Sequence, residues 1–226
     1  DAIRRELPTK GAGLAPAALA AIDGGLGELE EQIGAIQKHG RRIDTTVRGM
    51  LSLSRFALDT PEPTPINELI EEYVRLALNG AEQGHRTLPP AALELDLAPE
   101  VGIVPVVPHD IGRVVLNLAS NALYAVLDEP SPGRTPKVKV QSRDAGEAIE
   151  VRVSDNGPGI PEEILGRVFN PFFTTKPPGV GTGLGLSICQ KIIQEQHRGE
   201  LTIDSSPQEG TRVLVRLPKR DPAVQS

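Results

Sequence analysis

Residues 179–187 read GVGTGLGLS, a glycine-rich stretch that runs into a predicted helix over residues 183–197. The backbone N–H groups of such a loop, with the positive end of a helix dipole behind them, can hold phosphate groups. The stretch lacks the GK[ST] ending of a P-loop, and no strand leads into it as in a dinucleotide-binding turn. A phosphate site is one interpretation, and the neighbouring segments must support it.

A second segment, DNGPGI at residues 155–160, directly follows a strand predicted over residues 148–154. The carboxylate of Asp155 can accept a hydrogen bond from an amino group such as that of adenine. Gly157 and Gly159 would let the backbone approach a base closely. The alternative interpretation of this segment is an ordinary turn.

A third segment, FNPFFTTK at residues 169–176, holds three of the four phenylalanines of the chain within five residues. Taken alone, this cluster predicts a small hydrophobic anchor beneath a loop.

A fourth segment, LNLASNALYAV, carries Asn117 and Asn121 four residues apart, on one face of a helix predicted over residues 111–127. Two amide oxygens presented together can bind a hard cation such as Mg²⁺, whose other ligands would be waters and phosphate oxygens. The alternative is that both amides only hydrogen-bond within the fold.

The order of the four segments along the chain is more specific than any one of them. It resembles the N, G1, F and G2 boxes of the catalytic domain of sensor histidine kinases, within the gyrase, chaperone, histidine kinase and mismatch-repair ATPase superfamily. The resemblance covers about residues 66–218, including Gly210 and Thr211 in GTRVLVRLP. It implies an ATP-binding domain that uses Mg²⁺ and a response regulator receiver domain as a partner.

The resemblance also implies roles for single residues. Asn117 and Asn121 would hold Mg²⁺, Asn117 and Lys176 would serve catalysis, and the segment around the G2 glycines would close over the phosphates as a mobile lid. The residues that would contact the nucleotide are Asn121, Tyr124, Asp155, Gly157, Gly159, Ile160, Phe169, Thr175, Gly181, Thr182, Gly183, Leu184, Gly185, Leu186 and Thr211. Tyr124 departs from the family pattern, which often has Lys or Arg there, so Lys176 or Arg113 would have to replace that phosphate contact.

The residue at position 117 helps to separate the activities of this superfamily. Hydrolases place a glutamate there as the general base that activates water, whereas this chain has Asn117. A neutral imidazole already carries a lone pair, so transfer to histidine needs positioning and charge neutralisation more than a strong base. Asn117 therefore favours phosphoryl transfer to a histidine. The alternatives are a nucleotide-binding scaffold without kinase activity and an ATP-hydrolysing clamp.

The chain contains four histidines, His39, His85, His109 and His197. None is followed by the acidic residue and nearby proline that mark the acceptor motif of the resembled family. We therefore expect the chain to bind Mg-ATP without phosphorylating itself. Either the first helix of the acceptor hairpin precedes Asp1, which is the simpler account, or the motif has been lost.

The N-terminal region shows a different pattern from the rest of the chain. Apolar or small residues recur at steps of three and four, which predicts one long helix with an apolar heptad seam that packs against a partner chain. The seam consists of Leu26, Leu29, Ile33, Ile36, Gly40, Ile43, Val47, Met50 and Ser54. This helix looks like the second helix of the kinase dimerisation hairpin, so residues 1–60 are expected to be a helical dimerisation segment and residues 61–226 the ATP-binding domain. Pro61, Pro63 and Pro65 are expected to form a stiff linker between them.

Beyond this linker, helices and strands alternate, and hairpins replace strict βαβ units. A further helix is expected at residues 66–78, and strands are expected at 92–97, 101–107, 137–142, 148–154, 200–204 and 212–217. The pattern predicts an α+β fold, a two-layer sandwich of helices on one face of a mixed sheet.

Composition limits the remaining possibilities. The net charge of −6 argues against a nucleic-acid-binding surface, and no run of apolar residues is long enough for a transmembrane helix. Cys189 is the only cysteine, which excludes an intrachain disulfide and suits a reducing cytosol. We expect a cytoplasmic protein, or the cytosolic part of a larger membrane-linked sensor.

Overall fold

The computed structural model describes residues 60–83, 89, 92–131, 133–177, 180–207 and 209–219, together with residues 22, 24–29, 32–34 and 40 near the N-terminus. The chain divides into two compact units, residues 1–52 with 176–181, and residues 53–175 with 182–226. In the first unit the described N-terminal residues are helical. Five residues of the predicted heptad seam lie outside the described residues: Ile36, Ile43, Val47, Met50 and Ser54.

The second unit is built on a five-stranded sheet with the order β2-β4-β5-β7-β6. The strands are β2 (Leu93–Leu97), β4 (Val138–Asp144), β5 (Ala148–Asp155), β6 (Glu200–Ser206) and β7 (Gly210–Pro218). The edge strand β2 runs parallel to β4, and the other neighbours are antiparallel. The mixed sheet predicted from the sequence is confirmed.

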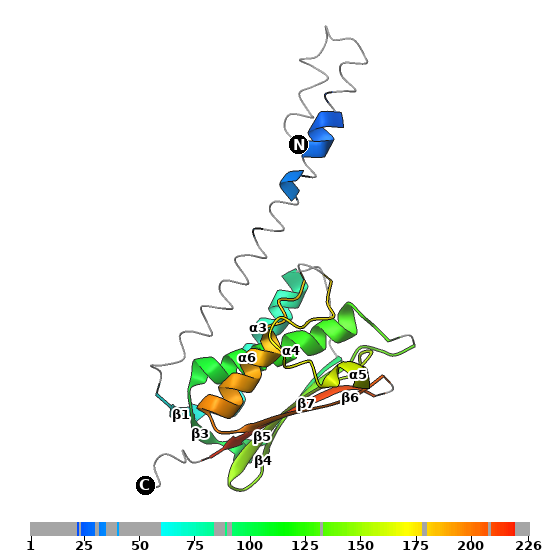
Figure 1. Cartoon of the computed structure of the whole chain (residues 1–226). Coiled ribbons are helices and arrows are strands. Elements are labelled where there is room, and N and C mark those ends of the chain that lie inside the picture. The colour runs from blue at the N-terminus through cyan, green and yellow to red at the C-terminus, as the bar shows by residue number, and fades with distance from the viewer. Residues whose placement is uncertain are drawn as a thin grey trace. The chain divides into compact units, whose positions relative to one another are not determined.

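Helices cover one face of this sheet (Figure 1). They are α3 (Ile66–Gln83), α4 (Pro108–Leu127) and α6 (Gly185–Lys191), which continues as the π-helical segment η3 (Ile192–Gln196). On β5, Ile149, Val151 and Val153 are buried, and they alternate with polar residues, as a strand with one covered face requires. The buried positions of α4 recur at steps of three and four. The two-layer α+β sandwich is therefore confirmed.

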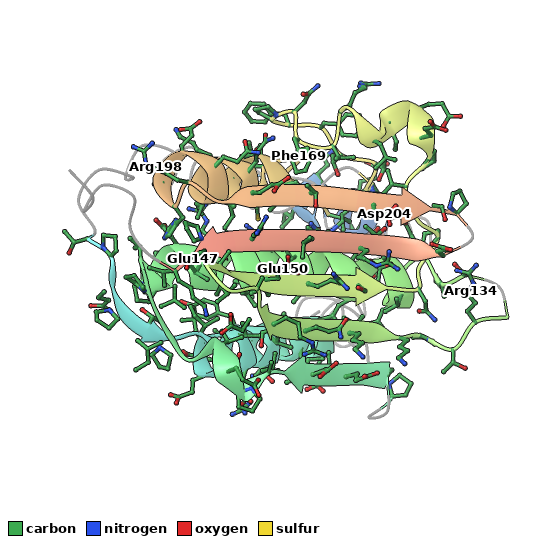
Figure 2. All side chains as sticks on the ribbon, turned by 90° about the horizontal axis from the view of Figure 1, so that it is seen from below. Arg134, Glu147, Glu150, Phe169, Arg198 and Asp204 are labelled. Atoms are coloured by element: carbon green, nitrogen blue, oxygen red, sulfur yellow. The ribbon has the colours of Figure 1, made fainter. Side chains whose placement is uncertain are left out.

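The opposite face of the sheet carries the alternate, polar side chains. Figure 2 shows this face, with Glu150 on β5 and Asp204 on β6. Asp204 forms an ion pair with Arg212 of β7 at 2.9 Å. The sheet therefore has a charged face opposite its apolar one.

The proline-rich segment differs from the stiff linker that the sequence predicts. Residues Glu62–Pro65 form strand β1, which pairs antiparallel with β3 (Ile103–Val106) in a separate two-stranded sheet. Thr64 is buried there, 5% exposed. Proline lacks the N–H that an interior strand needs, but a sheet of two strands consists only of edges, where proline is tolerated. The strand expected over residues 101–107 thus lies in this small sheet.

Two short elements were not predicted, the 3₁₀ turn η2 (Pro99–Val101) and the helix α5 (Glu162–Leu165). Both are too short to show the periodicity on which the sequence analysis relied.

Candidate functional site

Asp155 ends β5 and lies opposite Thr211 of β7. Its Oδ1 accepts a hydrogen bond from the Gly157 N–H at 2.9 Å, and the backbone of Thr211 provides another. Burial raises the pKa of Asp155 from its ordinary value of 3.8 to about 6, and these two hydrogen bonds oppose the rise. At pH 7 a carboxyl with this pKa is mostly ionised, and a pKa raised by burial is typical of groups at binding sites.

The segment that follows Asp155 makes two close contacts that require glycine. A Cβ at Gly157 would lie 2.8 Å from the Ala125 side chain of α4. Gly159 has a φ of +72°, and a Cβ there would overlap the backbone of Ser206. The segment is therefore wedged between α4 and the β6–β7 hairpin.

The first residue of β7 closes the same corner from the other side. Gly210 has a φ of +93°, and a side chain there would overlap the backbone of Asp155. The N–H of Ile160 donates to Ser205 Oγ of β6 at 2.8 Å. The ends of β5, β6 and β7 and residues 155–160 thus form one connected structure, which we call the strand-end corner.

A loop before β4 supports this corner through hydrogen bonds that no pattern in the sequence predicts. The Asn156 side chain accepts a hydrogen bond from Lys137 N–H at 2.8 Å and donates one to the Thr135 carbonyl at 2.7 Å. Arg134 lies at the end of the sheet where β5 stops (Figure 2) and donates to the carbonyls of Asn156 and Gly157 at 3.4 and 3.5 Å. No local pattern around Arg134 marks it, because its partners lie more than twenty residues along the chain.

The two asparagines of α4 lie on the side of the helix that meets α6. A Cβ at Gly185 would lie 3.7 Å from Asn117 Oδ1, so the first turn of α6 lies against this amide. The same amide opposes the effect of burial on the Cys189 thiol, whose pKa is raised to about 12. Asn121 and Tyr124 are half-buried on the following turns of α4. We call Asn117, Asn121 and the start of α6 the helix side of the site.

The segment over residues 169–175 contains a tight backbone contact of its own. Phe169 is half-buried and packs against the core, while Phe172 is 54% exposed and has a φ of +67°. Gly183 also has a positive φ, and a Cβ there would overlap the Phe172 backbone. Arg167 stacks over the Phe173 ring, with its guanidinium 4.6 Å from the centroid. The predicted hydrophobic anchor is therefore only partly buried.

The glycine-rich segment leads into α6 as predicted, although the regular helix begins at Gly185. Thr182 Oγ1 accepts a hydrogen bond from the N–H of Leu184 at 3.3 Å, and Leu184 is buried at the start of the helix. Leu186 packs partly against the core, and Thr175 is exposed. Lys176 and Gly181 belong to the first compact unit, and their expected contacts with phosphate stay predictions.

Two of the four histidines lie among the described residues. His109 is exposed in the first turn of α4. His197 accepts the Val107 N–H at Nε2, 3.1 Å away, and its Nδ1 lies 3.0 Å from the Ile192 carbonyl. A carbonyl can only accept, so Nδ1 carries the proton and the imidazole is neutral. His39 and His85 lie outside the described residues.

In the described part of the chain, no helix is both long and apolar enough to cross a membrane.

Residues 106–221, about half of the chain, match the family model described as histidine kinase-, DNA gyrase B-, and HSP90-like ATPase. The chain is 32% identical to the sensor protein TdiS of Thauera aromatica, over 70% of this chain and 28% of that protein. It is 30% identical to the sensor histidine kinase ZraS of Salmonella typhimurium, over 85% of this chain and 38% of that protein. The chain thus spans well under half the length of these curated relatives.

Solved structures show the same relationship. The nucleotide-free catalytic domain of histidine kinase ThkA matches with a TM-score of 0.57 and 32% identity, covering 70% of this chain and 95% of that one. Histidine kinase ThkA in complex with the response regulator protein TrrA matches with a TM-score of 0.65 and 29% identity, covering 85% of this chain and 52% of that one. Family match, fold and order of segments agree: the chain belongs to the histidine kinase-, DNA gyrase B- and HSP90-like ATPase family, as the ATPase domain of a sensor histidine kinase.

Proposed function

We propose that residues 61–226 bind Mg-ATP and provide the catalytic part of a histidine kinase. The observation that carries this proposal is Asp155, a carboxylate held at a strand end by the Gly157 N–H and followed by glycines that let residues 155–160 pack closely against α4 and the β6–β7 hairpin. The adenine amino group would donate to this carboxylate.

The helix side fits the phosphate end of the same nucleotide. Asn117 and Asn121 offer neutral amide oxygens, which suit Mg²⁺ when phosphate oxygens complete its shell. Bound Mg²⁺ would neutralise charge on the phosphates during transfer. Thr182 and Lys176 would hold the phosphates, with Lys176 in the catalytic role.

The proposed reaction transfers the γ-phosphoryl group of ATP to a ring nitrogen of a histidine. A P–N bond forms, the bond to the β-phosphate oxygen breaks, and ADP leaves. The group would then pass to an aspartate of a response regulator. The relative ThkA, solved in complex with a response regulator, supports this choice of partner.

We further propose that residues 1–60 form a dimerisation segment. Leu29 and Ile33, two residues of the predicted heptad seam, are 54% and 53% exposed in the single chain. A second copy of the seam would cover such side chains.

We also propose a cytosolic location. Cys189 is buried and needs no oxidising compartment, in keeping with this location.

The test is incubation with γ-labelled ATP and Mg²⁺, alone and with a separately produced acceptor hairpin from a related kinase. We expect label that is stable to base and labile to acid on the hairpin, and none on the chain. Steady release of phosphate without labelled protein would support the ATP-hydrolysing clamp instead. Tight ADP binding without transfer would support a scaffold. Label on the chain itself would refute our interpretation of its four histidines, and mapping would begin with His39.

A further inference from the structure

Three hydrogen-bonding groups meet at one hydroxyl in the strand-end corner. Ser205 Oγ lies 2.8 Å from the Ile160 nitrogen, 2.9 Å from the Gly210 carbonyl oxygen and 2.9 Å from Thr211 Oγ1. Ser205 lies directly opposite Thr211 in the β6–β7 pairing. No motif in the sequence marks this serine.

The direction of each hydrogen bond follows from counting protons. A serine hydroxyl has one hydrogen to donate and two lone pairs to accept with. The Ile160 N–H can only donate and the Gly210 carbonyl can only accept, so the Ser205 hydrogen points to Gly210. Thr211 must then donate its own hydrogen to Ser205. The Thr211 hydroxyl is left with lone pairs alone for any other partner.

Thr211 stands beside the predicted base-binding carboxylate. It pairs with Asp155 across β5 and β7, and its backbone hydrogen-bonds to that carboxyl. Strand alternation places Asp155, Ser205 and Thr211 on the same face of the sheet as the buried residues of their strands, under the helices. Ionised Asp155 is also an acceptor only, so the corner presents two acceptors.

Two acceptors at the end of the sheet would favour a base that presents hydrogen-bond donors to them. We propose that Ser205 is a positioning residue that fixes the Thr211 hydroxyl as an acceptor and thereby favours a 6-aminopurine over a 6-oxopurine. The proposal rests on the proposed nucleotide site. An amino group offers hydrogens to the two acceptors, whereas a carbonyl at the same position would leave them unpaired. Without Ser205, the Thr211 hydroxyl could rotate and donate to such a carbonyl.

The test compares ADP with inosine diphosphate, which has a carbonyl in place of the adenine amino group. Dissociation constants for both are measured by calorimetry on the wild-type chain, Ser205→Ala and Ser205→Thr. We expect the preference for ADP to fall about tenfold in Ser205→Ala and to return in Ser205→Thr, which keeps the hydroxyl. Thr202→Ala is the matched control, since it removes an exposed hydroxyl from the other face of the same strand.

The ratio of the two affinities separates positioning from stability. A variant that only weakens the fold loses affinity for both nucleotides together, and its ratio stays at the wild-type value. A double-mutant cycle with Thr211→Val adds a second measurement, because Ser205→Ala should change the ratio no further once the Thr211 hydroxyl is absent.

Two results would overturn the inference while leaving the nucleotide site intact: an unchanged ratio in Ser205→Ala, or a full effect of Ser205→Ala in the Thr211→Val background. Failure of the wild-type chain to bind ADP would instead reject the proposed function, and this inference with it.

Discussion

The strand-end corner and the helix side of the site are built in different ways. The corner is held together mainly by close backbone contacts at glycines. Gly157, Gly159 and Gly210 each contact a neighbouring segment where a side chain would not fit. On the helix side, the candidate ligands are the side chains of Asn117 and Asn121, carried by one face of α4.

Because the two halves are built differently, substitutions in them should affect stability and ligand affinity differently. A corner held by close backbone contacts should lose stability when atoms are added to it, and its one carboxylate should dominate the affinity for the base. A helix face that presents amides should tolerate substitution structurally and lose only metal-dependent affinity.

Replacing Asp155 by asparagine should have the largest effect on binding. The charged acceptor is lost and the new amide N–H₂ meets the donor of the base, so ADP affinity should fall about a hundredfold in calorimetry. The control is Asp204→Asn, which breaks an exposed ion pair with Arg212 on the polar face of the sheet. Equal affinity of Asp155→Asn and wild type would remove the corner from the site.

The pH dependence of binding should follow from the same carboxyl. Because burial raises the pKa of Asp155 to about 6, lowering the pH through 6 protonates the acceptor in the free site. ADP affinity should therefore be level above pH 7 and about tenfold lower at pH 5. The Asp155→Asn variant should lack this step, and a wild-type affinity independent of pH would contradict the assignment.

Lowering the pH should weaken ADP binding but stabilise the unliganded fold. The folded state takes up a proton near pH 6 that the unfolded chain, with an ordinary pKa of 3.8, takes up only at lower pH. This carboxyl therefore stabilises the fold as the pH falls from about 6 towards 4, and that gain is lost as the pH rises through 6. Urea unfolding of wild type and Asp155→Asn at pH 5 and 7.5 isolates the contribution, and a difference of the opposite sign would count against the burial of Asp155.

Replacing Asn121 by alanine should affect only the metal-dependent part of binding. We expect the gain in ATP affinity on adding Mg²⁺ to shrink about fivefold, since one oxygen ligand is lost, with affinity in EDTA unchanged. Asn79→Ala, at an exposed position of α3, serves as the control. A loss of similar size in EDTA would show that Asn121 acts on the fold or on the nucleotide directly rather than through the metal.

The smallest expected effect is a difference in unfolding free energy between alanine variants of two glycines that have the same backbone conformation. Gly159 and Gly146 have φ values of +72° and +78°, but a Cβ at Gly159 would overlap the Ser206 backbone, whereas a Cβ at Gly146 would meet nothing within 4 Å. Both alanine variants pay for the positive φ, so the extra loss of unfolding free energy in Gly159→Ala, about 1 kcal/mol, measures the contact alone. Equal losses would mean that the corner is looser than its geometry indicates.

The elements with strong periodicity could be predicted from the sequence, as α4 shows. It was expected at residues 111–127 and spans Pro108–Leu127, because its apolar stripe and the sheet face that it covers both follow local patterns. Strand β1 could not be predicted, because its prolines argue against a strand unless the partner is known. Only the pairing with β3, some forty residues away, makes it one.

The candidate site shows the same division. The order of the four segments identified the family, but the residues that hold them in place were not visible. Ser205 gains its meaning from the β6–β7 register, and the neutral form of His197 follows from Val107, ninety residues away. Hydrogen bonds of this kind depend on tertiary structure, for which no local pattern exists.

The most direct test of the account is titration of the ¹⁵N-labelled chain with Mg-ADP, followed by NMR. We expect the amide resonances of Gly157, Gly210 and Thr211 to shift, because the base would bind at the strand-end corner. Those of Gly146 and Glu147, in the turn at the other end of β5, should stay unchanged. Saturable binding that leaves the three corner amides unmoved would contradict the account.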